Sequence, residues 1–382
     1  MLRQINFRNY KAFAENTKIE LRPITVLLGK NSSGKSSICK LVSVLASALS
    51  GNARGILPLR NSSVVLGGRY EDLFFANTRN GLVIELSFND GSTISVEYLM
   101  NDGEFLLRSY TIGNGQQTFS KQYKSSEESK SDDFVGLTQN KLFEEIGQNK
   151  ETVSLAVDYI GPLRRAAKRA VFSTDIMNIA QVGYYGENTP YMLLNSHLRH
   201  DGLLLKQVSD WYGENMDGQS LDIIENGSTS GSYSIVVRRG NAVVNLADVG
   251  EGTNQLLPII TQSYASNADL IIVEQPALHL HPSAHAQVAY RLAESAIQSG
   301  KTYLVESHSE NFVLGLRNLV AKGKLPKTDV ALYFIDHDGE SATAQLIEIE
   351  DDGGLTEWPE GIFEEDFELL KEIRRGKGGI QN

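Results

Sequence analysis

Residues that can bind a phosphate group stand close to the start of the chain. The segment Gly29–Ser36 reads Gly-Lys-Asn-Ser-Ser-Gly-Lys-Ser and matches G-x-x-x-x-G-K-[ST] at every fixed position. We expect Lys35 to reach the β- and γ-phosphates of a nucleotide and the Ser36 hydroxyl to bind Mg²⁺. The predicted nucleotide contacts are Gly29, Lys30, Asn31, Ser32, Ser33, Gly34, Lys35, Ser36 and Ser37.

The flanking residues favour this reading over a glycine-serine loop that happens to precede a lysine. Ile24–Leu28 is an apolar run typical of a buried strand, and Ser36–Leu49 carries apolar residues at helical spacing. A strand, a glycine loop and a helix N-terminus direct backbone N–H groups and the positive end of a helix dipole at an anion. Gly29 and Gly34 stand where a Cβ would collide with phosphate or force an unfavourable backbone angle.

The second half of the chain carries further candidates. Ala268–Pro276 is an apolar strand that ends at Glu274, and we expect it to lie beside the loop strand, where NTPases hold Mg²⁺. Glu274 is therefore the second predicted metal ligand, against the alternative of a strand-end glutamate that faces solvent. His308 follows another apolar strand and could hydrogen-bond a γ-phosphate or the attacking water, although a lone histidine is more often structural.

Two further segments could meet an anion. Asp248–Ile260 is a glycine-spaced turn that opens a helix, so it offers a second helix N-terminus, although a plain helix cap would look the same. The turn after Ile160 gathers the densest positive charge of the chain, at Arg164, Arg165, Lys168 and Arg169. These side chains could touch nucleotide, nucleic acid or a partner's carboxylates, or they could form a solvated basic turn.

Composition limits the class of protein. The chain has 382 residues, of which 41% are hydrophobic and 22% charged, and this is globular composition. The formal net charge of −11 argues against general binding of nucleic acid, although a local basic groove stays open. The one cysteine, Cys39, falls inside the predicted helix, so we expect a buried thiol and a cytoplasmic protein without disulfides. Without an apolar run of about 18 residues or a signal peptide, no membrane partner is expected.

The patterns along the chain indicate an α/β fold with a β subdomain and an inserted lobe. Two N-terminal strands are expected before the loop strand, and an antiparallel sheet over 62–110 is followed by an exposed loop over 120–150. A strand over Val153–Ile160, a helical segment over 190–212 and a small β region over 221–246 come next. A hairpin over 330–349 contains Asp336 and Asp338, which we interpret as turn residues rather than the metal ligands of a nuclease.

These pieces together resemble ABC-type ATPases of the group that contains RecF, SMC heads and the overcoming-lysogenization-defect proteins. In finer detail the chain is similar to stand-alone bacterial AAA-type ATPases found in anti-phage defence loci. Val273–Pro282 matches their Walker B region, V-E-Q-P-E-L-H-L-H-P, with Ala277 in place of the usual Glu. The other matching segments are Tyr159–Arg164, Asp248–Gln255, Glu306–Phe312 and Trp358–Phe363.

The resemblance implies the domain plan. Residues 1–160 would form the N-terminal half of an ABC-type P-loop NTPase head, residues 161–245 an inserted helical and β lobe, residues 246–350 the C-terminal half, and residues 351–382 a helical tail. Neither a long coiled coil nor a Toprim domain is expected, because no sustained heptad is visible and too few residues follow His308. Two such heads would sandwich two ATP molecules, so that the signature residues of one head meet the γ-phosphate held by Lys35 of the other. The implied signature residues are Gly250, Gly252, Asn254 and Gln255.

Two departures from the family pattern matter, and Gln275 is a further feature with consequences for hydrolysis. Ser32 replaces a frequent Gly, which is tolerable because a backbone N–H remains, and Thr253-Asn254 replaces the Ser that usually precedes the Gln. Gln275 stands where most ABC ATPases carry the glutamate that activates water. An amide can orient water but cannot usefully accept a proton, so we expect slow hydrolysis and a long-lived ATP-bound dimer, unless Glu274 serves as both metal ligand and base.

The function implied is that of a Mg²⁺-dependent ATPase with catalytic residues Lys35, Glu274, Gln275 and His308. Its dimer would regulate a separately encoded effector, such as a nuclease or toxin, in anti-phage defence. The alternative is a RecF-like ATPase of DNA repair or DNA-end sensing, in which the basic turn lines a DNA groove. The ATPase subunit of a transporter is the weakest of the three readings, because no coupling region for a permease is recognisable.

Overall fold

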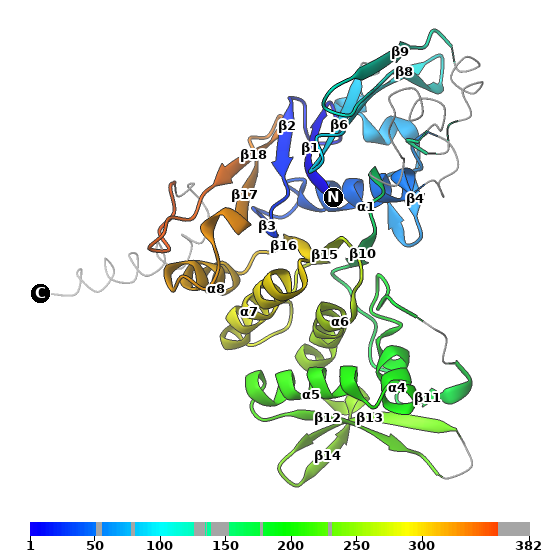
Figure 1. Ribbon diagram of the computed structural model, residues 1–382. Helices are drawn as coiled ribbons and strands as arrows, with labels where there is room; N and C mark the ends of the chain where they lie inside the picture. Colours follow the sequence, from blue (N-terminus) through cyan, green and yellow to red (C-terminus); the bar gives the residue numbers. More distant parts are fainter. Residues whose placement is uncertain are drawn as a thin grey trace, which may run out of the picture.

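The computed structural model describes residues 1–50, 56–77, 81–125, 134, 136–138, 153–175, 179–227 and 231–357. Its central element is a six-stranded sheet of order β10-β15-β16-β3-β17-β18 (Figure 1). The first five strands are parallel, and β18 runs antiparallel to β17. The strands are β3 (Ile24–Leu28), β10 (Val157–Ile160), β15 (Leu270–Glu274), β16 (Thr302–Glu306), β17 (Val330–His337) and β18 (Ala342–Ile347).

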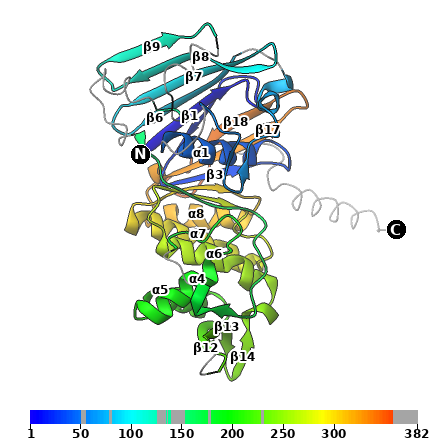
Figure 2. The same ribbon diagram turned by 90° about the vertical axis from the view of Figure 1, so that its right-hand side faces the viewer.

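A second, antiparallel sheet of order β2-β1-β6-β7-β8-β9 lies on the far side of helix α1 (Lys35–Leu49), which Figures 1 and 2 show between the two sheets. Its strands are β1 (Leu2–Arg8), β2 (Thr17–Glu20), β6 (Leu82–Phe88), β7 (Thr93–Asn101), β8 (Glu104–Gly113) and β9 (Thr118–Gln122). The short strands β4 (Arg60–Asn61) and β5 (Val64–Val65) pair with each other and contact α1. The predicted β subdomain is therefore confirmed.

The other face of the central sheet is covered by α6 (Glu251–Ala265), α7 (Pro282–Ser299) and α8 (Glu310–Ala321). The lobe lies beyond them, with α4 (Thr189–Arg199) and α5 (Leu203–Asn215) packed on a small sheet (Figure 2). That sheet contains β11 (Val171–Phe172), β12 (Ser220–Glu225), β13 (Ser232–Arg239) and β14 (Ala242–Asn245). Within the described ranges no helix is long enough to form a coiled-coil arm, and none is long and apolar enough to cross a membrane.

Strand periodicity divides the core between the two faces of the central sheet. Along β15, Leu270 and Ile272 join the cluster around α1, whereas Ile271 and Val273 join the cluster around α6 to α8. This alternation follows from side chains that point to opposite faces of a strand, and it explains why buried parallel strands read as continuous apolar runs. Cys39 is fully buried on α1 against the first of these clusters, as expected.

The described elements differ from the sequence predictions at three points. The segment 190–212 forms two helices instead of one, because Asp201 and Gly202 adopt positive φ between them. Only Val157–Ile160 of the strand predicted from Val153 is paired. Most of the loop predicted over 120–150, the Trp358–Phe363 match and residues 358–382 of the predicted helical tail lie outside the described residues, whereas residues 351–357 are described and form no helix.

The hairpin of β17 and β18 agrees with the prediction. Asp338 accepts hydrogen bonds from the backbone N–H groups of Glu340 and Ser341, at 2.8 Å each, so it is a turn residue as expected. The interpretation of Asp336 as a turn residue is wrong, because it lies in β17 and pairs with Thr343 in the ladder.

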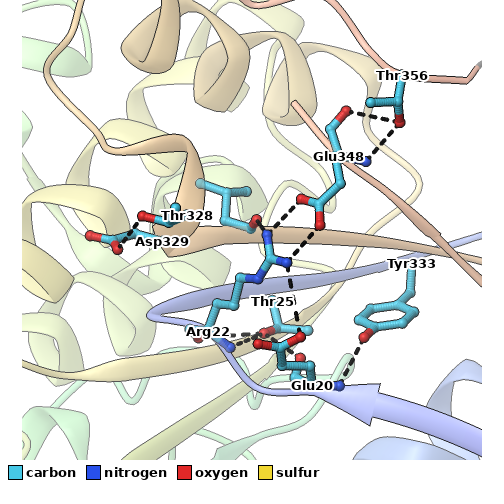
Figure 3. A network of polar contacts seen from close by, with 9 residues as sticks. Glu20, Arg22, Thr25, Thr328, Asp329, Tyr333, Glu348 and Thr356 are labelled. Atoms are coloured by element: carbon cyan, nitrogen blue, oxygen red, sulfur yellow. Dashed lines mark hydrogen bonds and ion pairs between the residues drawn. The ribbon is translucent and has the colours of Figure 1, made fainter. Parts of the chain in front are cut away.

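Arg22 lies just before β3 and forms hydrogen bonds with Val330 and Glu348, at the two ends of this hairpin (Figure 3). Its guanidinium donates two hydrogen bonds of 2.6 Å to Glu348 and one of 2.8 Å to the carbonyl of Val330. The hydrogen bond from Arg22 holds the pKa of Glu348 below its usual range, against the opposing effect of partial burial. A bidentate pair of this geometry stabilises more than an ordinary surface ion pair.

We predict that Glu348→Gln lowers the free energy of unfolding by about 1 kcal/mol at pH 7. Because the folded-state pKa lies below the unfolded value of about 4.3, the contribution is complete above that pH and is lost as the pH falls through the folded-state pKa. Urea unfolding at pH 7 and at about pH 3.5 measures both points. Asp351→Asn, which breaks an exposed pair with Lys327, is the control and should change little. A pH-independent difference would contradict this account.

Candidate functional site

The phosphate-binding loop runs from the end of β3 to the start of α1. Gly29 has φ 135° and Gly34 has φ 112°, a region in which other residues are strained. A Cβ on Gly29 would lie 2.0 Å from the carbonyl oxygen of Ile335, and one on Gly34 would lie 2.8 Å from the ring of Phe13. Both glycines are therefore required by neighbouring protein atoms as well as by any phosphate. Ser32, at φ 64°, adopts a conformation that explains the frequent Gly of its relatives.

Lys35 is the first residue of α1 and lies inside the curve of the loop. Its ammonium donates to the carbonyl oxygen of Gly29 at 2.9 Å and to that of Lys30, and its side chain is buried. Burial lowers the pKa of Lys35, while the nearby charge of Glu306 opposes this shift. The loop thus holds a desolvated cation, whose attraction for an anion is stronger than that of a hydrated one.

Two buried glutamates end neighbouring strands next to this loop. Glu274 and Glu306 stand opposite each other in the register of β15 and β16, and Glu306 accepts a hydrogen bond of 2.7 Å from the Ser36 hydroxyl. The hydroxyl of Tyr159 donates to Glu274. Burial raises the pKa of both carboxyl groups, and for Glu274 the charge of Glu306 adds to the effect of burial.

The expectation that the Glu274 strand adjoins the loop strand is wrong. β16 lies between β15 and β3, so the carboxylate on the strand next to the loop belongs to Glu306. The same signal that singled out Glu274, an acid at the end of an apolar strand, also applies to Glu306, and sequence reasoning assigned it no role. Strand order in a parallel sheet depends on crossover connections, which a local pattern does not encode.

These oxygens fit a magnesium ion. Mg²⁺ prefers hard oxygen donors and is usually held by one or two carboxylates together with waters and nucleotide phosphates. Ser36 and Glu274 remain the proposed ligands, and the hydrogen bond from Ser36 adds Glu306 to this donor set. When bound, the ion would neutralise negative charge on the phosphates. Among the described residues no cluster of three or more His, Cys, Asp and Glu side chains forms a metal cage, so the phosphates would have to complete the site.

Gln275 follows β15 in a strained conformation. Its φ is 46°, and its backbone N–H donates to the carbonyl of Glu306 at 2.7 Å. A non-glycine residue in the left-handed region persists only when its surroundings hold it there. The backbone at this position is therefore held in place, and Gln275 lines the same cavity as both glutamates, where an amide can orient a water but cannot take its proton.

A cavity of about 420 Å³ brings part of the predicted site together. Its wall includes Lys35, Ser36, Glu274, Gln275 and Glu306. The remaining lining residues are Lys11, Ala12, Asn31, Ser32, Gly34, Ser37 and Pro162. Sequence reasoning missed Lys11, which comes from the turn between β1 and β2 and carries φ 50°. Its one recognisable signal is an isolated basic residue in a turn, which is too common to be informative.

The helix start predicted to meet a phosphate lies elsewhere. Among the described residues that line the cavity, none comes from 248–255. Gly250 precedes α6, is exposed, and has open space where a Cβ would stand, whereas a Cβ on Gly252 would lie 2.8 Å from the carbonyl of His279. Asn254 lines a separate small recess, and the Gln255 side chain bonds to the backbone of Arg164 in the same chain.

His308 and the basic turn take different positions. His308 is exposed just beyond β16. Burial of part of its ring and the charge of Lys35 lower the pKa of His308, and a hydrogen bond with the backbone of Gly29 acts in the opposite direction. In the basic turn Arg164 is buried, so the interpretation as a wholly solvated turn is wrong. Arg169 forms a bidentate pair with Asp248 at 2.6 and 2.8 Å, and Lys168 donates to the Tyr191 hydroxyl at 2.6 Å.

The site consists of a glycine loop between a buried strand and a helix, with carboxylates at the ends of β16 and β15. This arrangement defines a P-loop NTPase with the fold of an ABC-type head. The solved structures with this fold include "Crystal structure of the SmcHead bound to the C-winged helix domain of ScpA", with TM-score 0.55 and 14% identity over 91% of this chain and 98% of that one. Another is the Smc head domain with an extended coiled coil bound to the C-terminal domain of ScpA, derived from Pyrococcus furiosus, with TM-score 0.50 and 12% identity over 98% of this chain and 99% of that one.

The chain belongs to the family described as "AAA domain, putative AbiEii toxin, Type IV TA system", which matches residues 24–314. A second family, described as "Protein of unknown function (DUF3696)", matches residues 325–373. No curated protein matches the chain. The resemblance to ABC-type ATPases and to the AAA-type ATPases of defence loci is thereby confirmed, as is the fold class.

Proposed function

We propose that this protein binds ATP with Mg²⁺, hydrolyses it slowly, and dimerises head to head around it to regulate a separately encoded cytoplasmic effector in anti-phage defence. The observation that carries the proposal is the composition of the cavity. It contains a buried lysine, a hydroxyl, two carboxylates and an amide, but the helix start at Gly250 is absent from its described lining. A second copy would bring that helix start to the open side of the cavity, where its N–H groups would meet the γ-phosphate.

The comparisons support a partner protein. The family description refers to a toxin of a type IV toxin–antitoxin system, and both solved Smc heads are bound to a domain of ScpA. A head that changes its association state with nucleotide is suited to switch such a partner, because only a ligand with different affinities for the two states can shift their populations. A nuclease or a toxin is the effector that we propose.

Sedimentation velocity with Mg²⁺ and ATP, with ADP, and without nucleotide tests the proposal directly. We expect a dimer only when Mg²⁺ and ATP are both present, a turnover below about one per second, and ATP-dependent co-purification of an effector from the native host. A monomer under every nucleotide condition, or rapid turnover without dimerisation, would contradict it.

Gly250→Ala separates the interface from the fold. Gly250 has φ −53° and open surroundings, so we expect the variant to fold with unchanged stability and to bind ATP normally. The added methyl group would stand at the helix start that approaches the other copy, so ATP-dependent dimerisation should weaken by about tenfold. Gly213→Ala on α5 controls for a glycine change in the lobe, because Gly213 has no positive φ and a Cβ there would make only an ordinary contact, 3.8 Å from the carbonyl oxygen of Gln219. Equal dimerisation by Gly250→Ala and wild type would remove Gly250 from the interface.

The DNA-binding alternative receives less support. A groove that tracks a DNA backbone needs free cations, but Arg164 is buried and Arg169 is paired with Asp248. Titration with duplex DNA at about 50 and 200 mM salt distinguishes the two readings. Tight binding that falls steeply with salt would favour a RecF-like role.

A further inference from the structure

Arg164 is a buried arginine that contacts the backbone behind the candidate ATP site. It lies in the turn after β10, two residues from Pro162 in the cavity wall, and only 5% of it is exposed. Burial lowers its pKa to about 10, and the charge of Glu274 opposes this shift. An arginine in such a place needs hydrogen-bond acceptors to offset the loss of hydration.

Its guanidinium finds them on the two residues that carry the proposed chemistry. Arg164 donates to the backbone carbonyl of Glu274 and, at 3.3 and 3.4 Å, to that of Gln275. The same two residues line the cavity, and Gln275 is held in a strained conformation. A shift of either side chain toward a bound nucleotide therefore acts on the carbonyls that Arg164 holds.

The backbone of Arg164 is held in turn by α6. The Gln255 side chain donates to the carbonyl of Arg164 at 3.0 Å and accepts from its N–H at 3.3 Å. Gln255 lies in the first turns of α6, the helix that begins after Gly250. Arg164 thus contacts the end of β15 through its side chain and the start of α6 through its backbone.

We propose that Arg164 and Gln255 are positioning residues that couple nucleotide binding in a chain's own cavity to the position of its own α6 N-terminus. Gln255 would then act within its own chain, and not on the nucleotide of the partner. The inference rests on the proposed function, because it assumes that the cavity binds ATP. It adds that ATP binding by each head would reposition the α6 N-terminus that this head contributes to the site of the partner.

Arg291 provides a matched control. It is equally buried, at 5% exposure, and it anchors the other end of α6 through hydrogen bonds to the Ser263 hydroxyl at 2.9 Å and the Ser263 carbonyl at 3.3 Å. Its contacts lie with α6 and with Glu294 on α7, away from the residues that line the ATP cavity. Arg291→Lys therefore reproduces the loss of a buried guanidinium without touching the proposed connection.

Hydrogen–deuterium exchange at a protein concentration that keeps wild type monomeric tests the coupling. In wild type we expect ATP with Mg²⁺ to slow exchange over residues 250–256 by about tenfold, within the usual range for two coupled sites. Arg164→Lys, which cannot reproduce the forked contact, and Gln255→Ala should both abolish this response while the dissociation constant for a fluorescent ATP analogue changes less than about threefold. Because the two residues act in series, the double variant should be no worse than either single variant.

The outcomes are distinct. Arg291→Lys should keep the wild-type response. Three results would overturn the coupling. They are a response that survives in Arg164→Lys, a response that disappears equally in Arg291→Lys, and a parallel loss of nucleotide affinity. Wild type that binds ATP without any change over residues 250–256 also overturns it, even if dimerisation occurs. Wild type that does not bind ATP contradicts the proposed function and this inference together, whereas a response without dimerisation contradicts the dimer alone.

Discussion

Lys35→Met is expected to lower ATP affinity by roughly 10- to 100-fold, because a charge-assisted hydrogen bond to phosphate contributes about 1.5–3 kcal/mol. Turnover should fall further, by about 10²-fold or more, since charge develops on the phosphate oxygens in the transition state. Methionine keeps the aliphatic stem of a side chain that is only 2% exposed, so the change is chiefly a loss of charge. Fluorescent nucleotide titration and phosphate release measure the two effects.

The control for Lys35→Met removes a lysine that has no part in the site. Lys206 lies on the exposed face of α5 and pairs with Asp210, so Lys206→Ala should leave both nucleotide binding and turnover unchanged. Thermal unfolding of each variant without nucleotide checks that the fold is intact. ATP binding by Lys35→Met at wild-type affinity would show that the cavity beside the loop is not the nucleotide site.

Gln275→Glu is expected to accelerate hydrolysis by about 10²-fold, the lower end of the range for general base catalysis. A carboxylate at this position can accept a proton from water, which an amide cannot do. The backbone contacts of residue 275, from its N–H to Glu306 and from Arg164 to its carbonyl, do not depend on the side chain. The new group should therefore take the place of the amide, and ATP affinity should change little. The ATP-bound dimer should have a correspondingly shorter lifetime.

The comparison with Gln275→Ala shows whether the carboxylate itself is responsible. Alanine removes the amide without supplying a base, so it should not accelerate turnover. If wild type already turns over rapidly, or if Gln275→Glu is no faster, the slow-switch hypothesis is wrong. In that case Glu274 or Glu306 would have to serve as the base, and Glu274→Gln and Glu306→Gln would identify which of them does.

The strand-loop-helix unit around Lys35 could be predicted with bounds correct to one residue. Its information is local, since an apolar β-branched run, a fixed glycine spacing and a helical apolar pattern each specify the backbone where they occur. The strand that ends at Glu274 was predicted for the same reason. The division of residues 189–215 into two helices was missed because the break depends on positive φ at Asp201 and Gly202, which no apolar pattern reveals.

Local patterns are therefore enough to identify a phosphate-binding loop, an acidic strand end, a second helix start and the resemblance to an ABC-type head. Which of these groups meet depends on the three-dimensional arrangement of the strands. Ser36 and Glu306 are 270 positions apart in sequence, and Arg164 lies 110 positions from Glu274, yet each pair is joined by a hydrogen bond. Such contacts follow from the order of strands in the central sheet, and that order is set by how the crossover helices pack on its two faces rather than by any local pattern.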